Sequence, residues 1–176
     1  MTLTSGKYNS KLQTGEWNYM STEKVLLNNT ISLPCPEGFH VMSEEERAKQ
    51  NMLLQGPGFC LNNPDIHVTV SAAWRQIGRF PSLVLTASDI MKKMETQIRK
   101  PMQQFGYQMD GYLTRNLGRH KAEGFRYRYD VQGKGMYGEA FVIKEKDMLY
   151  YLYVYIRQEF LEAGLAAWEN LLAEAE

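Results

Sequence analysis

The second half of the chain alternates apolar and polar side chains with period two, from Gly106 to about residue 157. Such alternation is typical of β-strands, whose successive side chains point to opposite faces of a sheet. Four segments carry it, joined by short polar connections: YQMDGYLTRNL, AEGFRYRYDVQ, GEAFVIKEK and DMLYYLYVYIRQ. We therefore predict an antiparallel meander of four strands.

Two other stretches follow the helical period. Residues 86–105 place Ile90 and Met94 on an apolar stripe with lysines outside it, and Pro101 should end the regular part. The last stretch, QEFLEAGLAAWENLLAEAE, places leucines and Trp168 on one side and glutamates on the other. We predict two amphipathic helices, the second of which closes the chain against the sheet.

The first half of the chain mixes short elements with turn residues. Residues 1–15 are polar without a period, which predicts a flexible N-terminal tail. EWNYMSTEKVLLNNTISLP indicates one or two strands with a possible turn at Asn28–Asn29. Ser43 and Glu46 form a capping-box pattern, so we predict a short helix over about residues 44–54. FCLNNPDIHVTVSAAW then indicates a hairpin, because NNPD is typical of a turn.

Composition bounds the class of protein. With 176 residues, 44% of them hydrophobic, the chain can bury one substantial core, and residues 16–176 are predicted to form a single domain. Lys plus Arg and Asp plus Glu both number 20, so binding to nucleic acid or membrane would need a local patch. The sequence contains no apolar run of the length that a signal peptide or a membrane span needs. We expect a cytoplasmic protein that binds neither nucleic acid nor membrane.

VQGKGMYGEAFVIK contains a G-x-G-x-x-G pattern at Gly133, Gly135 and Gly138. A dinucleotide or P-loop site needs such glycines before a helix, whereas here a strand follows. A kinase glycine loop does lie between strands and Lys144 could serve it, but the chain has no H-R-D or D-F-G sequence. We predict that Gly133 and Gly135 supply the positive φ angles of a hairpin turn.

Metal and catalytic motifs are weak. Cys35 with His40, and Cys60 with Asp65 and His67, could be drawn as a zinc site, but zinc ligands are usually paired more closely. In a reducing compartment both cysteines would be thiols. The chain has no G-x-S-x-G and no H-E-x-x-H sequence. We expect no catalytic residue, no metal and no cofactor, and favour a protein that is not an enzyme.

Aromatic residues and arginines gather on two of the predicted strands. Tyrosine and arginine are enriched where proteins bind partners. We predict a non-catalytic binding or adaptor domain with an unknown protein partner, in a monomer or weak homodimer, that uses Arg126, Arg128, Tyr151, Tyr153 and Tyr155. A helix covering these tyrosines would remove that prediction. Single-stranded nucleic acid also stacks on such rows, but the balanced charge argues against it.

An alternative is a small-ligand-binding protein or an enzyme. Its pocket would lie between the meander and the long helix, lined by tyrosines and by His67 or His120. Two titratable groups within hydrogen-bond reach inside a deep pocket would favour catalysis.

The order of elements resembles the PsbP-like (Mog/PsbP-like) superfamily over about residues 25–176. The resemblance is carried by four stretches: ISLPCPEGFHVMSEEE, HVTVSAAW, KAEGFRYRYDVQGKGMYGEAFVIKEKDMLYYLYVYIRQE and AGLAAWENLLAEAE. The chain is similar in particular to uncharacterised proteins of anaerobic Gram-positive bacteria. The resemblance implies an α+β fold, an α/β/α sandwich with a central, mainly antiparallel sheet flanked by helices, and binding or assembly in place of catalysis. No functional residue of the family matches a position here, so photosynthetic and nuclear-transport roles do not transfer.

Overall fold

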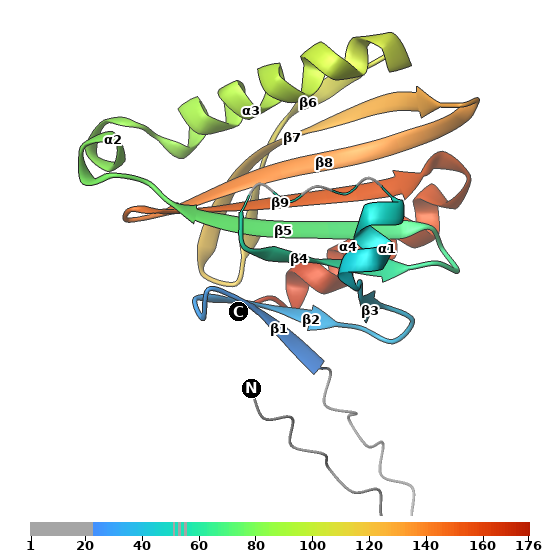
Figure 1. Cartoon of the computed structure of the whole chain (residues 1–176), viewed down its shortest axis with the longest axis horizontal. Helices are drawn as coiled ribbons and strands as arrows, with labels where there is room; N and C mark the ends of the chain where they lie inside the picture. The colour runs from blue at the N-terminus through green and yellow to red at the C-terminus, as the bar shows by residue number, and fades with distance from the viewer. Residues whose placement is uncertain (1–22, 51, 53, 55) are drawn as a thin grey trace, which may run out of the picture.

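The computed structural model describes residues 23–50, 52, 54 and 56–176. The predicted tail over residues 1–15 and the predicted domain start at residue 16 lie outside these residues. Within them, the chain forms a two-stranded hairpin, a seven-stranded sheet and helices on both faces of that sheet (Figure 1).

The seven-stranded sheet is antiparallel at every pair of neighbouring strands. Its order is β3-β4-β5-β9-β8-β7-β6. The strands are β3 His40–Val41, β4 Gly58–Asn63, β5 Val68–Gln76, β6 Gln108–Leu117, β7 His120–Val131, β8 Lys134–Glu145 and β9 Met148–Arg157. The predicted meander is β6 to β9, and the predicted hairpin is β4 with β5. A separate hairpin consists of β1 Glu23–Leu27 and β2 Ile31–Cys35.

Helices cover the two faces of the sheet, which confirms the predicted α/β/α arrangement. The long helix α3, Ala87–Met102, packs over β7 and β8. The last helix α4, Leu161–Ala173, contacts β9 and β2 on the other side. We call these two sides the α3 face and the α4 face. Each face has its own core because side chains alternate along every strand.

Residues of the α3 face include Phe125, Tyr127, Ala140, Val142 and Leu149. Residues of the α4 face include Val70, Phe141, Leu152, Val154 and Trp168. Both sets are buried, so the sheet is a middle layer with two apolar sides.

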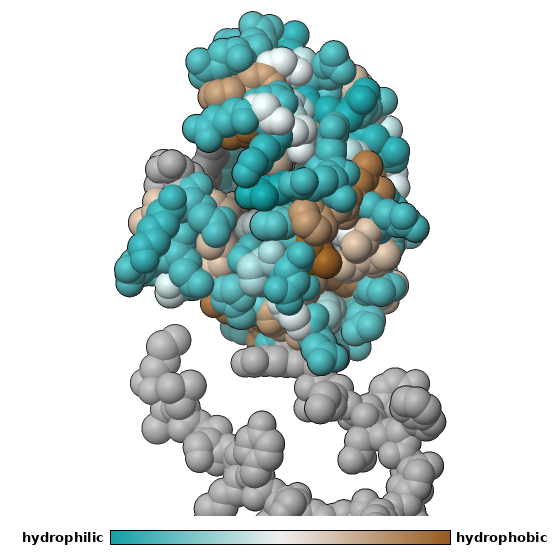
Figure 2. Space-filling model, turned by 90° about the vertical axis from the view of Figure 1, so that its right-hand side faces the viewer, coloured by the Kyte–Doolittle hydropathy of each residue, from teal (hydrophilic) through white to brown (hydrophobic). Residues whose placement is uncertain are grey.

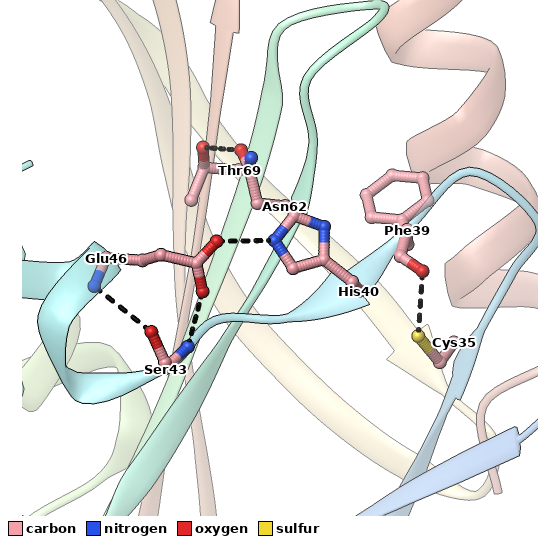
Figure 3. A network of polar contacts seen from close by, with 7 residues as sticks. All are labelled: Cys35, Phe39, His40, Ser43, Glu46, Asn62 and Thr69. Carbon is pink, nitrogen blue, oxygen red and sulfur yellow. Dashed lines mark hydrogen bonds and ion pairs between the residues drawn. The ribbon is translucent and has the colours of Figure 1, made fainter.

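Both predicted helix starts in the first two thirds of the chain have reciprocal caps. Ser43 caps α1, Glu44–Lys49, and Glu46 bonds back to the Ser43 backbone (Figure 3). Thr86 and Asp89 cap α3 in the same way. The helix α1 is shorter than predicted. Pro101 sits in the last turn of α3, and the 3-10 helix η1, Gln103–Phe105, follows it.

Turn positions match the sequence pattern with one exception. Asn28 and Asn29 both have positive φ between β1 and β2, as expected for a tight hairpin turn. In the β7–β8 turn the positive φ angles belong to Gln132 and Gly133, so the prediction for Gly135 is wrong. Gly135 instead lies in β8, where a Cβ would overlap the Gln158 side chain. The strand β8 follows Gly133 and contains Gly135 and Gly138, where a phosphate loop needs the start of a helix.

A buried carboxylate stands in the core of the α4 face. Glu139 is 0% exposed and accepts hydrogen bonds from the Tyr137 hydroxyl at 2.6 Å and the Trp168 indole at 2.9 Å. The Arg115 guanidinium lies 3.5 Å from the same carboxylate and 2.7 Å from Glu169 on α4. This network connects β8, β6 and α4, because a buried charge needs both a counter-ion and hydrogen-bond donors.

Two elements were not predicted from the sequence, the two-residue strand β3 and the short helix α2, Arg79–Val84. The helix α2 buries none of its residues. Phe80, Leu83 and Val84 are respectively 80%, 84% and 68% exposed on it. None of the helices in the described part of the chain has both the length and the apolar character needed to cross a bilayer.

Candidate functional site

A cleft of about 660 Å³ opens on the α3 face, between α3 and strands β5, β7 and β9. The sheet contributes tyrosines to it: Tyr127, Tyr129, Tyr151, Tyr153 and Tyr155. We call it the tyrosine cleft. The helix α3 supplies the facing wall with Gln97, Ile98, Pro101 and Met102, and the segment after α1 adds Gln50, Met52 and Leu54. A pocket between the meander and the long helix was the alternative expectation, and the structure places one there.

The tyrosines form two rows because residues two apart on a strand share a face. Tyr153 and Tyr155 on β9 are stacked, with ring centroids 6.4 Å apart and planes 10° apart. Tyr127 and Tyr129 on β7 are stacked with centroids 5.9 Å apart. The rows bring aromatic rings to the lining of the cleft, which suits apolar or planar ligand groups.

The hydroxyls of these tyrosines are held neutral. Burial raises the pKa of Tyr129 to about 12 and, with a smaller contribution from Tyr151, that of Tyr153 to about 12. Burial also raises the pKa of Tyr127 and Tyr155, which lie close enough for a hydrogen bond between them. The Tyr153 hydroxyl donates to the Met94 sulfur at 3.3 Å. At neutral pH the rows therefore offer hydrogen-bonding groups without charge.

Other polar atoms at the cleft are few and also uncharged. Thr69 and Ser71 lie on β5, and the Thr69 hydroxyl donates to Asn62 at 2.9 Å (Figure 3). Gln50 and Gln97 bring side-chain amides. Among the described residues that line the cleft, none is Asp, Glu, Lys, Arg or His. The lining is thus apolar with neutral donors and acceptors.

The edge of the cleft keeps apolar side chains accessible to solvent. Phe105 and Val131 line it and remain 39% and 38% exposed. Met52, Met102 and Met136 also line it, and the flexible thioether side chain adapts to ligands of different shape. Figure 2 shows the end of the molecule that lies on the right in Figure 1, with hydrophobic residues reaching a mostly hydrophilic surface.

The five residues predicted as one partner surface do not lie together. Tyr151, Tyr153 and Tyr155 line the tyrosine cleft on the α3 face. Arg126 is paired in register with Glu139, so it lies on the α4 face, on the far side of the sheet. Arg128 shares that face and makes two hydrogen bonds of 2.8 Å to Asp110. The strand alternation that separates them is the physical reason.

The histidines predicted for a pocket are not among its lining residues. His67 lies in the β4–β5 turn with positive φ and packs on the Phe160 ring at 4.7 Å. His120 is buried at the start of β7, with its Nδ1 2.7 Å from Glu145. The expectation that either histidine lines the pocket is therefore wrong.

Two residues that could be drawn as zinc ligands, Cys35 and His40, make other contacts. His40 bonds to Glu46 at 3.1 Å, and Cys35 Sγ donates to the Phe39 carbonyl at 3.5 Å (Figure 3). Cys35 and Cys60 are not joined by a disulfide. In the described ranges, no group of three or more His, Cys, Asp or Glu side chains is placed to hold a metal ion.

Comparison with known proteins finds similar structures but no match by sequence. No protein-family model and no curated protein matches the chain. The solution structure of cyanobacterial PsbP (CyanoP) from Synechocystis sp. PCC 6803 is similar, with a TM-score of 0.63 and 11% identity, over 94% of this chain and 98% of that one. The crystal structure of LpqN, involved in cell envelope biogenesis of Mycobacterium tuberculosis, has a TM-score of 0.54 and 15% identity, over 90% and 86%.

These comparisons show a PsbP-like fold, as the resemblance implied. At 11% and 15% identity they carry the fold alone. The closer similarity to proteins of anaerobic Gram-positive bacteria stays a prediction.

Proposed function

We propose that the chain is a non-catalytic binding protein that holds an uncharged, largely apolar small molecule in the tyrosine cleft. The observation that supports this most is the lining of the cleft, which combines aromatic and aliphatic side chains with neutral hydroxyls and amides. The proposal combines two expectations from the sequence. One is a non-catalytic binding role, and the other is a ligand pocket between the meander and the long helix.

The size of the cleft suits a small molecule. Its volume of about 660 Å³ lies in the range of roughly 300–1,000 Å³ in which most ligand sites fall. A peptide or protein occupant would need a longer or wider surface, with interface areas of about 800 Å² on each partner. The cleft therefore favours a compact ligand.

The lining also selects against charge. An ionised group transferred into an apolar site without a counter-charge loses its hydration and gains no ion pair. Tyr129 and Tyr153 remain neutral at physiological pH, so their hydroxyls supply no ionised partner for a charged ligand. Neutral acceptors such as carbonyls, ethers and hydroxyls fit the Tyr, Ser and Thr hydroxyls.

The same lining favours binding over catalysis. General acid–base catalysis commonly uses histidine or a carboxyl group within hydrogen-bond reach of the reacting atoms. The described lining residues offer only tyrosine hydroxyls as titratable groups, and those of Tyr129 and Tyr153 have a pKa of about 12.

Two fluorescent probes with the same ring skeleton test the proposal. N-phenyl-naphthylamine is uncharged, and anilinonaphthalene sulfonate carries one negative charge. Titration of the full chain with each should show tighter binding of the neutral probe. Equal or tighter binding of the sulfonate would contradict selection against charge.

Matched tryptophan variants locate the binding. Gln97→Trp places a large ring in the exposed wall of the cleft, whereas Lys92→Trp adds the same ring to an exposed position of α3 that is not part of the lining. The first should weaken binding of the neutral probe about tenfold or more by occupying the site, and the second should leave it unchanged. Circular dichroism and thermal melting check that both variants fold. Equal affinities of Gln97→Trp and wild type would place the probe outside the cleft.

A further inference from the structure

A second surface, separate from the tyrosine cleft, stands out on α2. We call Arg79–Val84 the α2 tip. Its Phe80, Leu83 and Val84 are more exposed than any other large hydrophobic residue among those the structure describes. Exposed apolar side chains clustered in this way mark a surface that meets another apolar phase. The α2 tip protrudes at the left of Figure 1, beyond the strands of the sheet.

Backbone and side-chain hydrogen bonds fix the α2 tip to the protein. The Ser82 hydroxyl donates to the Lys146 carbonyl at 2.5 Å. The Ile77 amide donates to the Asp147 carbonyl at 2.7 Å, so the segment before the helix is tied to the β8–β9 turn. The exposed apolar side chains therefore sit on an anchored segment.

Positively charged residues lie in the α2 tip and in the segments next to it. Arg79 and Lys146 are exposed, and Arg75 is exposed where β5 leads toward the helix. The one acidic residue of the β8–β9 turn, Asp147, accepts a hydrogen bond from Gln76 at 2.7 Å. That bond, and after it the positive charges of Arg79 and Lys146, lower the pKa of Asp147, which places both cations close to the turn.

We propose that the α2 tip docks on a lipid surface with negatively charged headgroups. Phe80, Leu83 and Val84 would enter the interface between headgroups and acyl chains, and Arg79 with Lys146 would contact the headgroups. The expectation of no membrane binding rested on the overall charge, and it left open a local patch of this kind. The proposal is independent of the ligand in the tyrosine cleft.

A second copy of the chain fits the α2 tip less well. A stable protein interface needs about 800 Å² on each partner with matching shape. Three outward side chains on a protruding six-residue helix provide a small, convex contact. A bilayer needs no matching shape, so it accepts such a protrusion.

Vesicle co-sedimentation of the full chain tests the proposal. One set of vesicles contains phosphatidylcholine with phosphatidylserine, and the other contains phosphatidylcholine alone. Wild type should pellet with the first set, and added salt should weaken that binding. The double variant Phe80→Ser, Leu83→Ser should lose binding roughly tenfold or more, because two buried apolar groups are removed.

Matched variants separate the α2 tip from general hydrophobicity and charge. Leu26→Ser with Tyr112→Ser removes one leucine and one aromatic ring that are 51% and 57% exposed on other elements, and should bind like wild type. Arg79→Gln with Lys146→Gln should bind phosphatidylserine vesicles several-fold more weakly while keeping the fold.

Three results would overturn the proposal. Wild type that pellets with neither set of vesicles would exclude lipid docking. Equal binding to phosphatidylcholine alone would exclude headgroup recognition. A dimer in sedimentation velocity without lipid, abolished by Phe80→Ser with Leu83→Ser, would show that a second copy covers the α2 tip.

Discussion

Removing Arg115 should destabilise the protein through the buried carboxylate that it faces. Arg115→Met removes the guanidinium that lies 3.5 Å from the Glu139 carboxylate, and Glu139 is 0% exposed. Breaking a buried ion pair from one side costs about 3–5 kcal/mol. Glu139 keeps its hydrogen bonds from Tyr137 and Trp168, and the Arg115 side chain is 26% exposed, so a smaller loss is expected. We expect the free energy of unfolding to fall by about 2–3 kcal/mol.

Urea unfolding followed by circular dichroism measures this loss. In the Arg115→Met background, Glu139→Gln should recover part of the stability because it removes the unpaired buried charge. The two substitutions should therefore be non-additive, with a coupling of about 0.5–3 kcal/mol. Arg128→Met is the control, since Arg128 pairs with Asp110 at an exposed position and should cost much less. A negligible loss for Arg115→Met, or strictly additive effects, would refute the interpretation of Glu139.

Three other perturbations test the packing around the sheet. Gly164→Ala should lower the melting temperature, with a loss of about 1–3 kcal/mol, because its Cβ would meet Ile156 Cγ2 at 2.5 Å; an unchanged or higher melting temperature would contradict that contact. Thr86→Ala should cost about 1 kcal/mol in urea unfolding by removing the α3 cap; an unaltered midpoint would count against the cap. Tyr129 and Tyr153 have folded-state pKa values of about 12, above the ordinary 10.0, so their contribution to stability is complete below pH 10.0 and lost as the pH rises through about 12. Absorbance of tyrosinate during alkaline titration should show late-titrating groups, and complete ionisation near pH 10.0 in a folded chain would rule this out.

The elements with a strong period could be predicted from the sequence. The strands β6 to β9 alternate clearly, and α3 has both an apolar stripe and a capping box. The helix α2 was not predicted, because it has only six residues and no side-chain cap, although Phe80, Leu83 and Val84 follow the helical spacing. The strand β3 has only two residues and no period of its own.

The candidate site was predicted in its place but not in all its residues. Alternation within one strand shows which of its side chains share a face, but it does not relate two strands. That relation needs the register, which pairs Tyr153 with Ala140 and Ala140 with Phe125. Arg126 therefore lies on the α4 face, whereas the tyrosines lie on the α3 face. Placing the β7–β8 and β8–β9 turns first would have fixed this register, since turn length determines it.

The position of His67 could not be predicted from its neighbours in the sequence. Its strand-like neighbours suggested a place on β5, but it adopts positive φ in the β4–β5 turn and packs on Phe160 near α4. A contact between residues so far apart in the chain leaves no local signal in the sequence.

Hydrogen–deuterium exchange with and without N-phenyl-naphthylamine tests the central claim most directly. If the tyrosine cleft binds an uncharged apolar molecule, amides in the second half of α3 and in β9 should exchange more slowly when the probe is present. Amides in α4 and in the β1–β2 hairpin, which lie on the other face of the sheet, should be unaffected. Protection confined to α4 and β1–β2, or no protection at saturating probe, would contradict the proposed site.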